Sequence, residues 1–208
     1  KVVLREADGT EIQVSLNTLS ERDRKYAILQ TPPRIEINVS ANTDRDNKGL
    51  SMNRGPGAQI QKETVVVEVE INKSSSQPYE APLRAELYMI GRPEQKDGYV
   101  ILDKTTTRFQ FADESKHAFT SDAVSLQQLE MGQQKGVEYS GYLVVVRDKS
   151  RDVVAMKCSK LDYEKNAEAI MAGEKGTMYD GDFEPMGKVQ DKQGKQDTKR
   201  KPFPGRRF

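Results

Sequence analysis

The side chains that could do chemistry in this sequence are few and stand apart from one another. His117 is the only histidine and Cys158 the only cysteine. A general base needs a reacting group within hydrogen-bond reach and a second group that orients it, and no motif around His117 supplies either. Cys158 lies in the apolar run 153–159, where a cysteine packs as a small hydrophobic residue. The sequence therefore predicts that the protein is not an enzyme.

Oxygen ligands recur at two places, but neither place completes a metal site. Asp44 and Asp46 occupy the first and third positions of a calcium-type loop, whose fifth position is Lys48, a cation. Its twelfth position is Gly55, which lacks the bidentate carboxylate of such loops. Residues 180–184 gather three carboxylates, which we interpret as a solvated acidic stretch. We therefore expect no metal and no cofactor.

Basic residues gather near the C-terminus together with two phenylalanines, which could stack on a base. A flexible glycine-rich loop at 53–57 adds a further arginine, and loops between strands often carry binding residues. Binding of nucleic acid or another polyanion through the tail is therefore one alternative function. The net charge of +1 counts against it, because no global field gathers anions. The candidate interaction residues are Arg54, Lys199, Arg200, Lys201, Phe203, Arg206, Arg207 and Phe208.

Tyrosines offer a second alternative, a carbohydrate-binding surface on which sugars stack. The absence of tryptophan counts against it. Strand alternation instead predicts that most of these tyrosines lie in the core or in cross-strand pairs. The tyrosines in question are Tyr79, Tyr88, Tyr99, Tyr139 and Tyr142.

Length and composition limit the size of the core. The chain has 208 residues, of which 35% are hydrophobic and 31% charged, so we expect one sandwich-sized domain with extensive surface and some unfolded length. No apolar run approaches the roughly 20 residues of a membrane span. The chain begins at Lys1, inside a strand-like run, which we interpret as a processed product with a periplasmic or extracellular location.

The first thirty residues predict a hairpin followed by a short helix. Residues 2–7 and 11–16 are strand-like, and Asp8-Gly9 between them is a strong hairpin-turn signal because glycine accepts positive φ. Ser20 can cap a helix over about 21–29, with Asp23 near the reciprocal capping position.

This N-terminal segment resembles the second half of an SLA1 homology domain 1 module, a small SH3-like β unit. The similarity covers about 30 of the 208 residues, and the family's first half is not in the chain. In eukaryotic adaptors the family binds short peptides, and similar segments are common in envelope proteins of planctomycete- and verrucomicrobia-type bacteria. The resemblance therefore implies a bacterial envelope protein. The matching residues are Val3, Leu4, Asp8, Gly9, Val14, Ser15, Leu16, Leu19, Ser20, Glu21, Arg22, Asp23 and Tyr26.

About seven strands are predicted between residues 34 and 160, without alternating helices. This pattern is typical of an antiparallel sandwich of immunoglobulin or fibronectin-III kind, with a partly open barrel as the alternative. Residues 42–62 are expected to be a loop, 127–136 irregular or a short helix, and 162–172 a short closing helix. The expected strands are 34–41, 63–72, 83–91, 99–111, 117–126, 138–147 and 153–159.

Three parts are therefore expected along the chain: a partial SLA1-homology-like module at 1–31, a β-sandwich at 32–173 and a disordered polar tail at 174–208. The interpretation we prefer is a non-catalytic interaction or scaffolding domain of a bacterial envelope or secreted protein, with another protein as its partner. The two alternatives are the carbohydrate-binding sandwich and the polyanion-binding tail.

Overall fold

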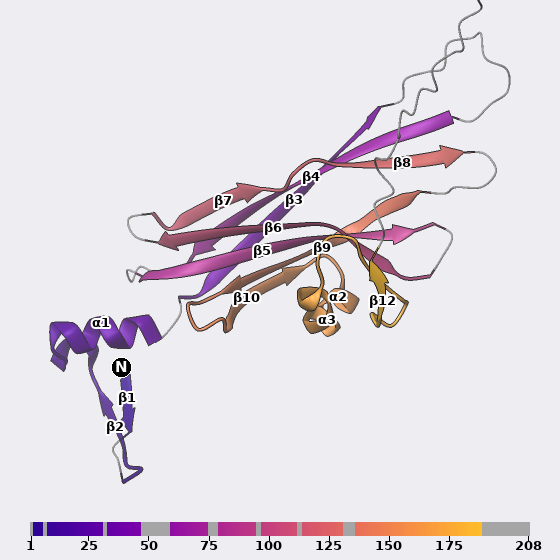
Figure 1. Cartoon of the computed structure of the whole chain (residues 1–208). Coiled ribbons are helices and arrows are strands. Elements are labelled where there is room, and N and C mark those ends of the chain that lie inside the picture. Colours follow the sequence, from indigo (N-terminus) through magenta and orange to yellow (C-terminus); the bar gives the residue numbers. More distant parts are fainter. Residues whose placement is uncertain are drawn as a thin grey trace, which may run out of the picture.

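The computed structural model describes residues 2–5, 8–30, 33–46, 59–74, 79–94, 97–111, 114–130 and 136–188. Within these ranges the chain is mainly β-structure with a few short helices (Figure 1). In chain order the elements are β1 (Val2–Arg5), β2 (Glu11–Val14), η1 (Leu16–Thr18), α1 (Glu21–Gln30), β3 (Ile35–Asp46), β4 (Gln59–Lys73), β5 (Tyr79–Pro93), β6 (Tyr99–Phe111), β7 (Lys116–Thr120), β8 (Val124–Glu130), β9 (Val137–Arg147), β10 (Val153–Cys158), α2 (Leu161–Lys165), α3 (Ala167–Ala172), β11 (Thr177–Tyr179) and β12 (Pro185–Lys188).

Two antiparallel sheets make up the main body. The larger has six strands in the order β10-β9-β5-β6-β11-β12, and the smaller contains β3, β4, β7 and β8. β4 is long enough to pair with β3 along one side and with both β7 and β8 along the other. Ser121 separates β7 from β8, because its backbone N–H donates to the Val67 carbonyl while its Oγ accepts the Val67 N–H.

The space between the two sheets holds the main core. Val65, Val67 and Val69 alternate along β4 and are buried on the face that meets the larger sheet. Leu87 and Met89 of β5 are buried opposite them. The β-branched residues on β4 stand on one face because successive side chains of a strand point to opposite sides.

A second core lies on the other side of the six-stranded sheet, which we call the outer face. Tyr88 and Ile90 of β5 pack there against Tyr163 of α2, Ile170 of α3 and Phe183 from the β11–β12 connection. The helices thus form a third layer over part of the outer face (Figure 1). As a result β5 is buried on both faces between residues 85 and 91.

The antiparallel, mainly β class predicted from the sequence is confirmed. An immunoglobulin constant-type sandwich divides seven strands between sheets of four and three. Here the larger sheet has six strands and the smaller one includes the paired halves β7 and β8. The likeness to that family therefore extends to two packed antiparallel sheets and not to their strand count.

The expected disordered tail begins too early, because residues 174–188 belong to the fold. Thr177, Tyr179 and Phe183 are buried, β11 pairs with β6, and β12 pairs with β11. Polar composition suggested an unfolded segment, but the isolated aromatic residues Tyr179 and Phe183 fill places in the second core. Residues 189–208 lie outside the described residues.

The loop expected at 42–62 and the irregular segment expected at 127–136 are also partly wrong. β3 continues to Asp46, opposite Lys62 of β4, and β8 continues to Glu130, opposite Gln59. Backbone pairing along β4 sustains these polar strand ends, so hydrophobic alternation does not reveal them. Residues 47–58 and 131–135 lie outside the described residues.

The N-terminal elements follow local hydrogen bonds. Gly9 has φ 90° in the β1–β2 turn, where the Thr10 N–H donates to the Asp8 carboxylate at 2.8 Å. The Asp23 N–H donates to Ser20 Oγ at 3.1 Å, and the Ser20 hydroxyl donates to the Asp23 carboxylate at 2.6 Å. The first bond caps a backbone N–H at the start of α1, and the second joins the two side chains. The hairpin and α1 lie at one end of the sandwich (Figure 1).

One glycine in β9 provides a stability test. Gly141 has φ 147°, and a Cβ atom there would meet Ser159 Oγ and the Tyr163 ring. We expect Gly141→Ala to lower the free energy of unfolding by about 1–3 kcal/mol, through backbone strain and overpacking. Gly181→Ala is the matched control, because a Cβ atom there meets no neighbouring atom within 4 Å. Urea unfolding that gives equal losses for both variants would contradict this packing.

Candidate functional site

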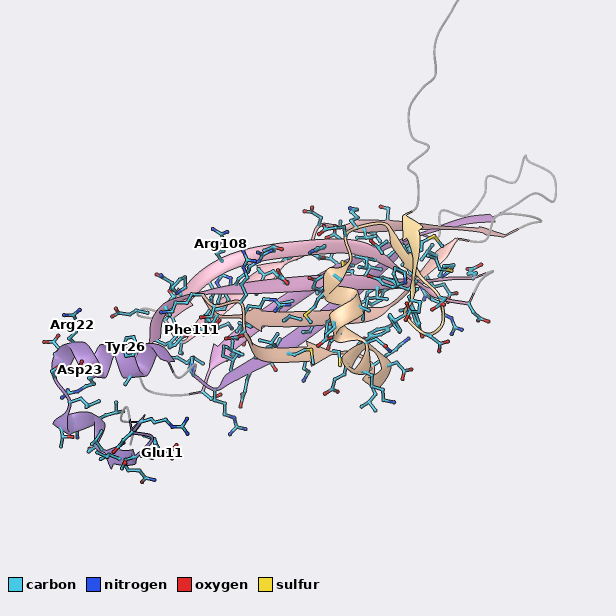
Figure 2. All side chains as sticks on the ribbon, turned by 60° about the horizontal axis from the view of Figure 1, so that its bottom comes forward. Glu11, Arg22, Asp23, Tyr26, Arg108 and Phe111 are labelled. Carbon is cyan, nitrogen blue, oxygen red and sulfur yellow. The ribbon has the colours of Figure 1, made fainter. Side chains whose placement is uncertain are left out.

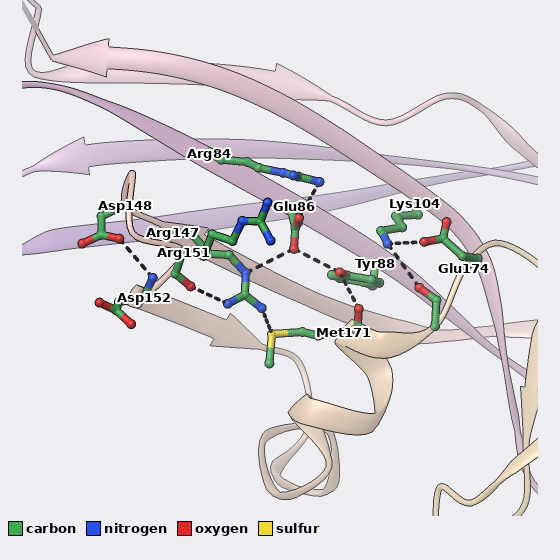
Figure 3. A network of polar contacts seen from close by, with 11 residues as sticks. Arg84, Glu86, Tyr88, Lys104, Arg147, Asp148, Arg151, Asp152, Met171 and Glu174 are labelled. Atoms are coloured by element: carbon green, nitrogen blue, oxygen red, sulfur yellow. Dashed lines mark hydrogen bonds and ion pairs between the residues drawn. The ribbon is translucent and has the colours of Figure 1, made fainter.

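A buried carboxylate on the outer face organises the most connected polar cluster. The Glu86 side chain on β5 is only 8% exposed. Its Oε1 atom lies 2.8 Å from Nη2 of Arg84, and its Oε2 atom lies 3.5 Å from Nε of Arg147 on β9. The Tyr88 hydroxyl lies 3.1 Å from the same Oε2 (Figure 3). Glu86 therefore holds two guanidinium groups and one hydroxyl together above the sheet.

Tyr88 connects this cluster to the helical layer. Its hydroxyl also lies 3.3 Å from the Met171 carbonyl at the end of α3. Burial, assisted by the Glu86 charge, raises the pKa of Tyr88 far above its usual value, so the hydroxyl stays protonated and donates. Lys104 on β6 lies over the Tyr88 ring and donates to the Gly173 carbonyl at 3.2 Å. The cluster is thus fixed from both the sheet and α3.

Each of the three guanidinium nitrogens of Arg147 has a contact. Besides its contact with Glu86, its Nη1 atom donates to the Arg151 carbonyl at 2.9 Å and its Nη2 atom lies 2.9 Å from the Met171 sulfur (Figure 3). Arg151 has φ 72° in the β9–β10 turn, a conformation that non-glycine residues rarely adopt. The Asp148 carboxylate accepts the N–H groups of Ser150 and Asp152 and fixes that turn.

Three arginines stand side by side across the sheet. Arg84 of β5 is in register with Arg147 of β9 on one side and with Arg108 of β6 on the other. Cross-strand partners share a face, and neighbouring strands are ~4.8 Å apart, so these residues form a row about 10 Å long. We call Arg84, Arg108 and Arg147 the arginine row. Arg108 projects away from the sheet (Figure 2).

The arginine row carries more positive charge than the fold neutralises. Like charges directly opposite each other destabilise a sheet. Glu86 contacts Arg84 and Arg147, whereas Arg108 is exposed and makes no hydrogen bond or ion pair with another described residue. The neighbouring turn 148–152 adds two acidic and two basic residues, hence no net charge. A local arrangement that opposes stability is typical of a functional surface.

An apolar strip lies beside the row. Val153 on β10 is in register with Arg147, and Met156 is in register with Val145 of β9. Val153 is 45% and Met156 37% exposed. The outer face therefore presents guanidinium groups and aliphatic side chains next to one another.

The residues singled out in the sequence are not part of this cluster. Arg54 and the basic C-terminal candidates, from Lys199 to Phe208, lie outside the described residues. Cys158 is half-buried against the second core, and burial raises the pKa of its thiol. Asp180 accepts the N–H groups of Asp182 and Glu184, so it stabilises a turn.

The tyrosines do not form a sugar-stacking surface. Tyr79 and Tyr88 are buried, and Tyr99, Tyr139 and Tyr142 are half-buried. The expectation of core or cross-strand positions is therefore confirmed. No exposed tyrosine platform is found on the sheets within the part of the chain that the structure describes.

Sequence reasoning missed the arginine row. The alternation Arg84-x-Glu86-x-Tyr88 could have indicated that charged residues share one face of a strand. The alignment of Arg108 and Arg147 with Arg84 depends on the register of three strands and on bulges in two pairings. No pattern within the sequence of a single strand indicates that alignment.

His117 gives a test of pH dependence. Its ring stacks on Phe109 with centroids 4.3 Å apart, and its buried Nε2 atom has no hydrogen-bond partner among the described residues. Burial lowers the pKa of His117 below 6.5, so the unfolded chain takes up the proton at higher pH than the folded chain does. Its contribution to stability is therefore complete above about pH 6.5 and decreases as the pH falls through that value.

We expect native protein to lose stability between pH 7.5 and pH 5.5 relative to His117→Gln, which cannot charge at this position. Urea unfolding at the two pH values measures the difference. The same pH dependence in both proteins would show that His117 does not titrate differently on folding.

Comparison with known proteins identifies no family. No family model matches the chain, and no curated protein matches it. A crystal structure from Akkermansia muciniphila is similar at 14% sequence identity and a TM-score of 0.25, over 62% of this chain and 73% of that chain. A likeness of this degree supports no inference about activity or partners.

Neither a membrane-crossing helix nor a candidate metal cluster is present in the described residues. No helix there has the length and apolar character that crossing a membrane requires. The same residues contain no group of three or more histidine, cysteine, aspartate or glutamate side chains placed to hold a metal ion.

Proposed function

We propose that this chain is a non-catalytic interaction domain of a bacterial envelope or secreted protein, and that it binds a protein partner through the arginine row. The observation that carries the proposal is the register of Arg84, Arg108 and Arg147 on the outer face, which the helices cover only in part. Arg84 is 45% exposed in its side chain, and Arg108 is exposed.

A rigid support favours such a role. Residues 85–91 of β5 are buried on both faces, so the strand that carries Arg84 is held between two cores. Binding groups on a rigid element lose little conformational entropy when a partner docks. In this proposal the sandwich is of the immunoglobulin-like kind in its two packed antiparallel sheets.

The resemblance of residues 1–30 to SLA1 homology domain 1 supports the bacterial envelope part of the proposal. The paired strands β1 and β2 and the capped helix α1 occupy that segment. In this proposal the segment is an accessory module, and the arginine row is the principal contact surface.

Affinity capture from an extract of the source organism tests the proposal. The baits are the native chain, Arg108→Glu and Arg34→Glu. Arg34 is also exposed but precedes β3, away from the row. The two variants carry the same change of charge at different places on the surface. We expect the native chain and Arg34→Glu to retain the same partner and Arg108→Glu to lose it.

Circular dichroism of the three baits confirms that each is folded. Equal retention of the partner by Arg108→Glu and Arg34→Glu would contradict the proposed contact surface. Loss from both variants would indicate a general effect of charge rather than recognition by the row.

A further inference from the structure

We infer that the partner presents an acidic protein segment containing an aliphatic residue, with its carboxylates on Arg84 and Arg108 and its aliphatic side chain on Val153 and Met156. This inference rests on the proposed function and specifies the chemistry of the partner.

The hydrogen-bonding capacity of the row points to carboxylates on two of its members. All three nitrogens of the Arg147 guanidinium are engaged by Glu86, the Arg151 carbonyl and the Met171 sulfur. Arg84 contacts Glu86 through Nη2, which leaves its other N–H groups free of any contact with the described residues. All N–H groups of the Arg108 guanidinium are likewise free of any contact with the described residues. A guanidinium binds a carboxylate through two parallel N–H groups, so Arg84 and Arg108 are the available sites.

Glu86 and Arg147 act as positioning residues in this arrangement. Glu86 fixes one nitrogen of Arg84 at 2.8 Å, while the second guanidinium on its other oxygen keeps the local charge positive. A partner carboxylate next to the row would relieve the repulsion between cross-strand arginines. The loss of this repulsion on binding therefore adds to the affinity for the partner.

The apolar strip favours a protein over other acidic polymers. Val153 and Met156 lie one strand beyond Arg147, exposed in the free chain. Arginine and methionine are enriched at protein interfaces, and methionine adapts to irregular apolar partners. A polyuronate has no aliphatic side chain that would use this strip.

Single-stranded nucleic acid fits this face less well. Its binding usually relies on exposed aromatic rings that stack on successive bases. Tyr88, the aromatic residue that contacts Glu86 on this face, is buried under Lys104 and α3. The exposed aromatic side chain among the described residues is Tyr26, which lies on α1.

Four synthetic probes of matched length distinguish these ligands: a random copolymer of glutamate and leucine, polyglutamate, polygalacturonate and oligo(dT). Fluorescence polarisation with native protein at low salt measures binding. We expect the copolymer to bind at least about fivefold more tightly than each of the others, because it satisfies both the row and the apolar strip.

Two variants assign the contacts, with Arg34→Gln as the control. Arg108→Gln should weaken the binding of both the copolymer and polyglutamate by about tenfold, since it removes a charge-assisted contact with a carboxylate. Met156→Gln should abolish the advantage of the copolymer while leaving polyglutamate binding unchanged.

Tighter binding of polygalacturonate or oligo(dT) than of the copolymer would overturn the inference. So would copolymer binding that Arg108→Gln leaves unchanged. If the copolymer fails to bind while Arg108→Glu still loses the captured partner, the partner chemistry is wrong and the proposed function stands. If Arg108→Glu also retains that partner, the proposed function itself fails.

Discussion

A chain that ends at Gly173 is expected to lose its cooperative fold, whereas a chain that ends at Lys188 is expected to keep it. The segment between these residues contributes Tyr179 and Phe183 to the second core, where they are 2% and 3% exposed. Removing a buried aromatic side chain costs about 3–5 kcal/mol. Two such losses approach the whole stability of a typical domain, about 5–15 kcal/mol.

The contacts of this segment explain why the fold depends on it. Phe183 stacks on Tyr99 with ring centroids 4.3 Å apart, and the Tyr179 hydroxyl donates to the Ala169 carbonyl at 2.9 Å. The Gly176 N–H donates to the Ile101 carbonyl at 2.8 Å. Without them, Ile101 and Tyr163 of the outer face would be exposed.

Thermal unfolding of the two shortened chains measures this effect. The chain ending at Lys188 serves as the control for removal of the C-terminal residues. We expect a single transition near that of the full chain for residues 1–188 and no cooperative transition for residues 1–173. A cooperative transition of similar midpoint in both would mean that β11 and β12 do not stabilise the fold.

Glu86→Gln is expected to lower the free energy of unfolding by about 2–3 kcal/mol. The substitution keeps the size of the side chain but removes the negative charge between Arg84 and Arg147. Breaking a buried ion pair by removing one partner is strongly destabilising because the other charge remains. The Arg84 and Arg147 side chains are 45% and 22% exposed, so water screens part of the loss and the estimate stays below that for fully buried pairs.

Urea unfolding of Glu86→Gln and of Glu36→Gln compares the buried carboxylate with an exposed one on β3. The control should change stability by less than about 0.5 kcal/mol. The double variant Glu86→Leu/Arg147→Leu should lose less than the sum of its single variants, since it removes both members of the Glu86–Arg147 pair and leaves only the 45% exposed Arg84 without its partner. Equal effects of Glu86→Gln and Glu36→Gln would show that Glu86 does not organise the arginine row.

Much of the fold could be predicted because the alternation of apolar and polar residues within several strands indicates which face is buried. Residues 63–72 place valine or isoleucine at every second position from 65 to 71, and this run lies within β4. The capping signal at Ser20 and Asp23 likewise contains all of its participants within one turn. Features of this kind depend on neighbours in sequence, which makes them readable without a structure.

The remaining features depend on partners far along the chain. Tyr179 and Phe183 appear as isolated apolar residues in a polar segment until the second core surrounds them. The arginine row joins residues of three strands whose pairings contain register shifts near 79–83 and 89–91. A shift of one residue would turn Arg108 or Arg147 to the opposite face, so composition and spacing could not locate the site.

Site-specific photo-cross-linking tests most directly whether the outer face is the interaction surface. A photoreactive side chain replaces Thr106, which is exposed on β6 between Lys104 and Arg108, and leaves every arginine of the row intact. The control position is Ser40, exposed on β3 of the other sheet. After irradiation in an extract of the source organism, we expect the captured partner to be cross-linked from position 106 and not from position 40. A partner cross-linked from position 40 alone would contradict the assignment of the arginine row as the binding site.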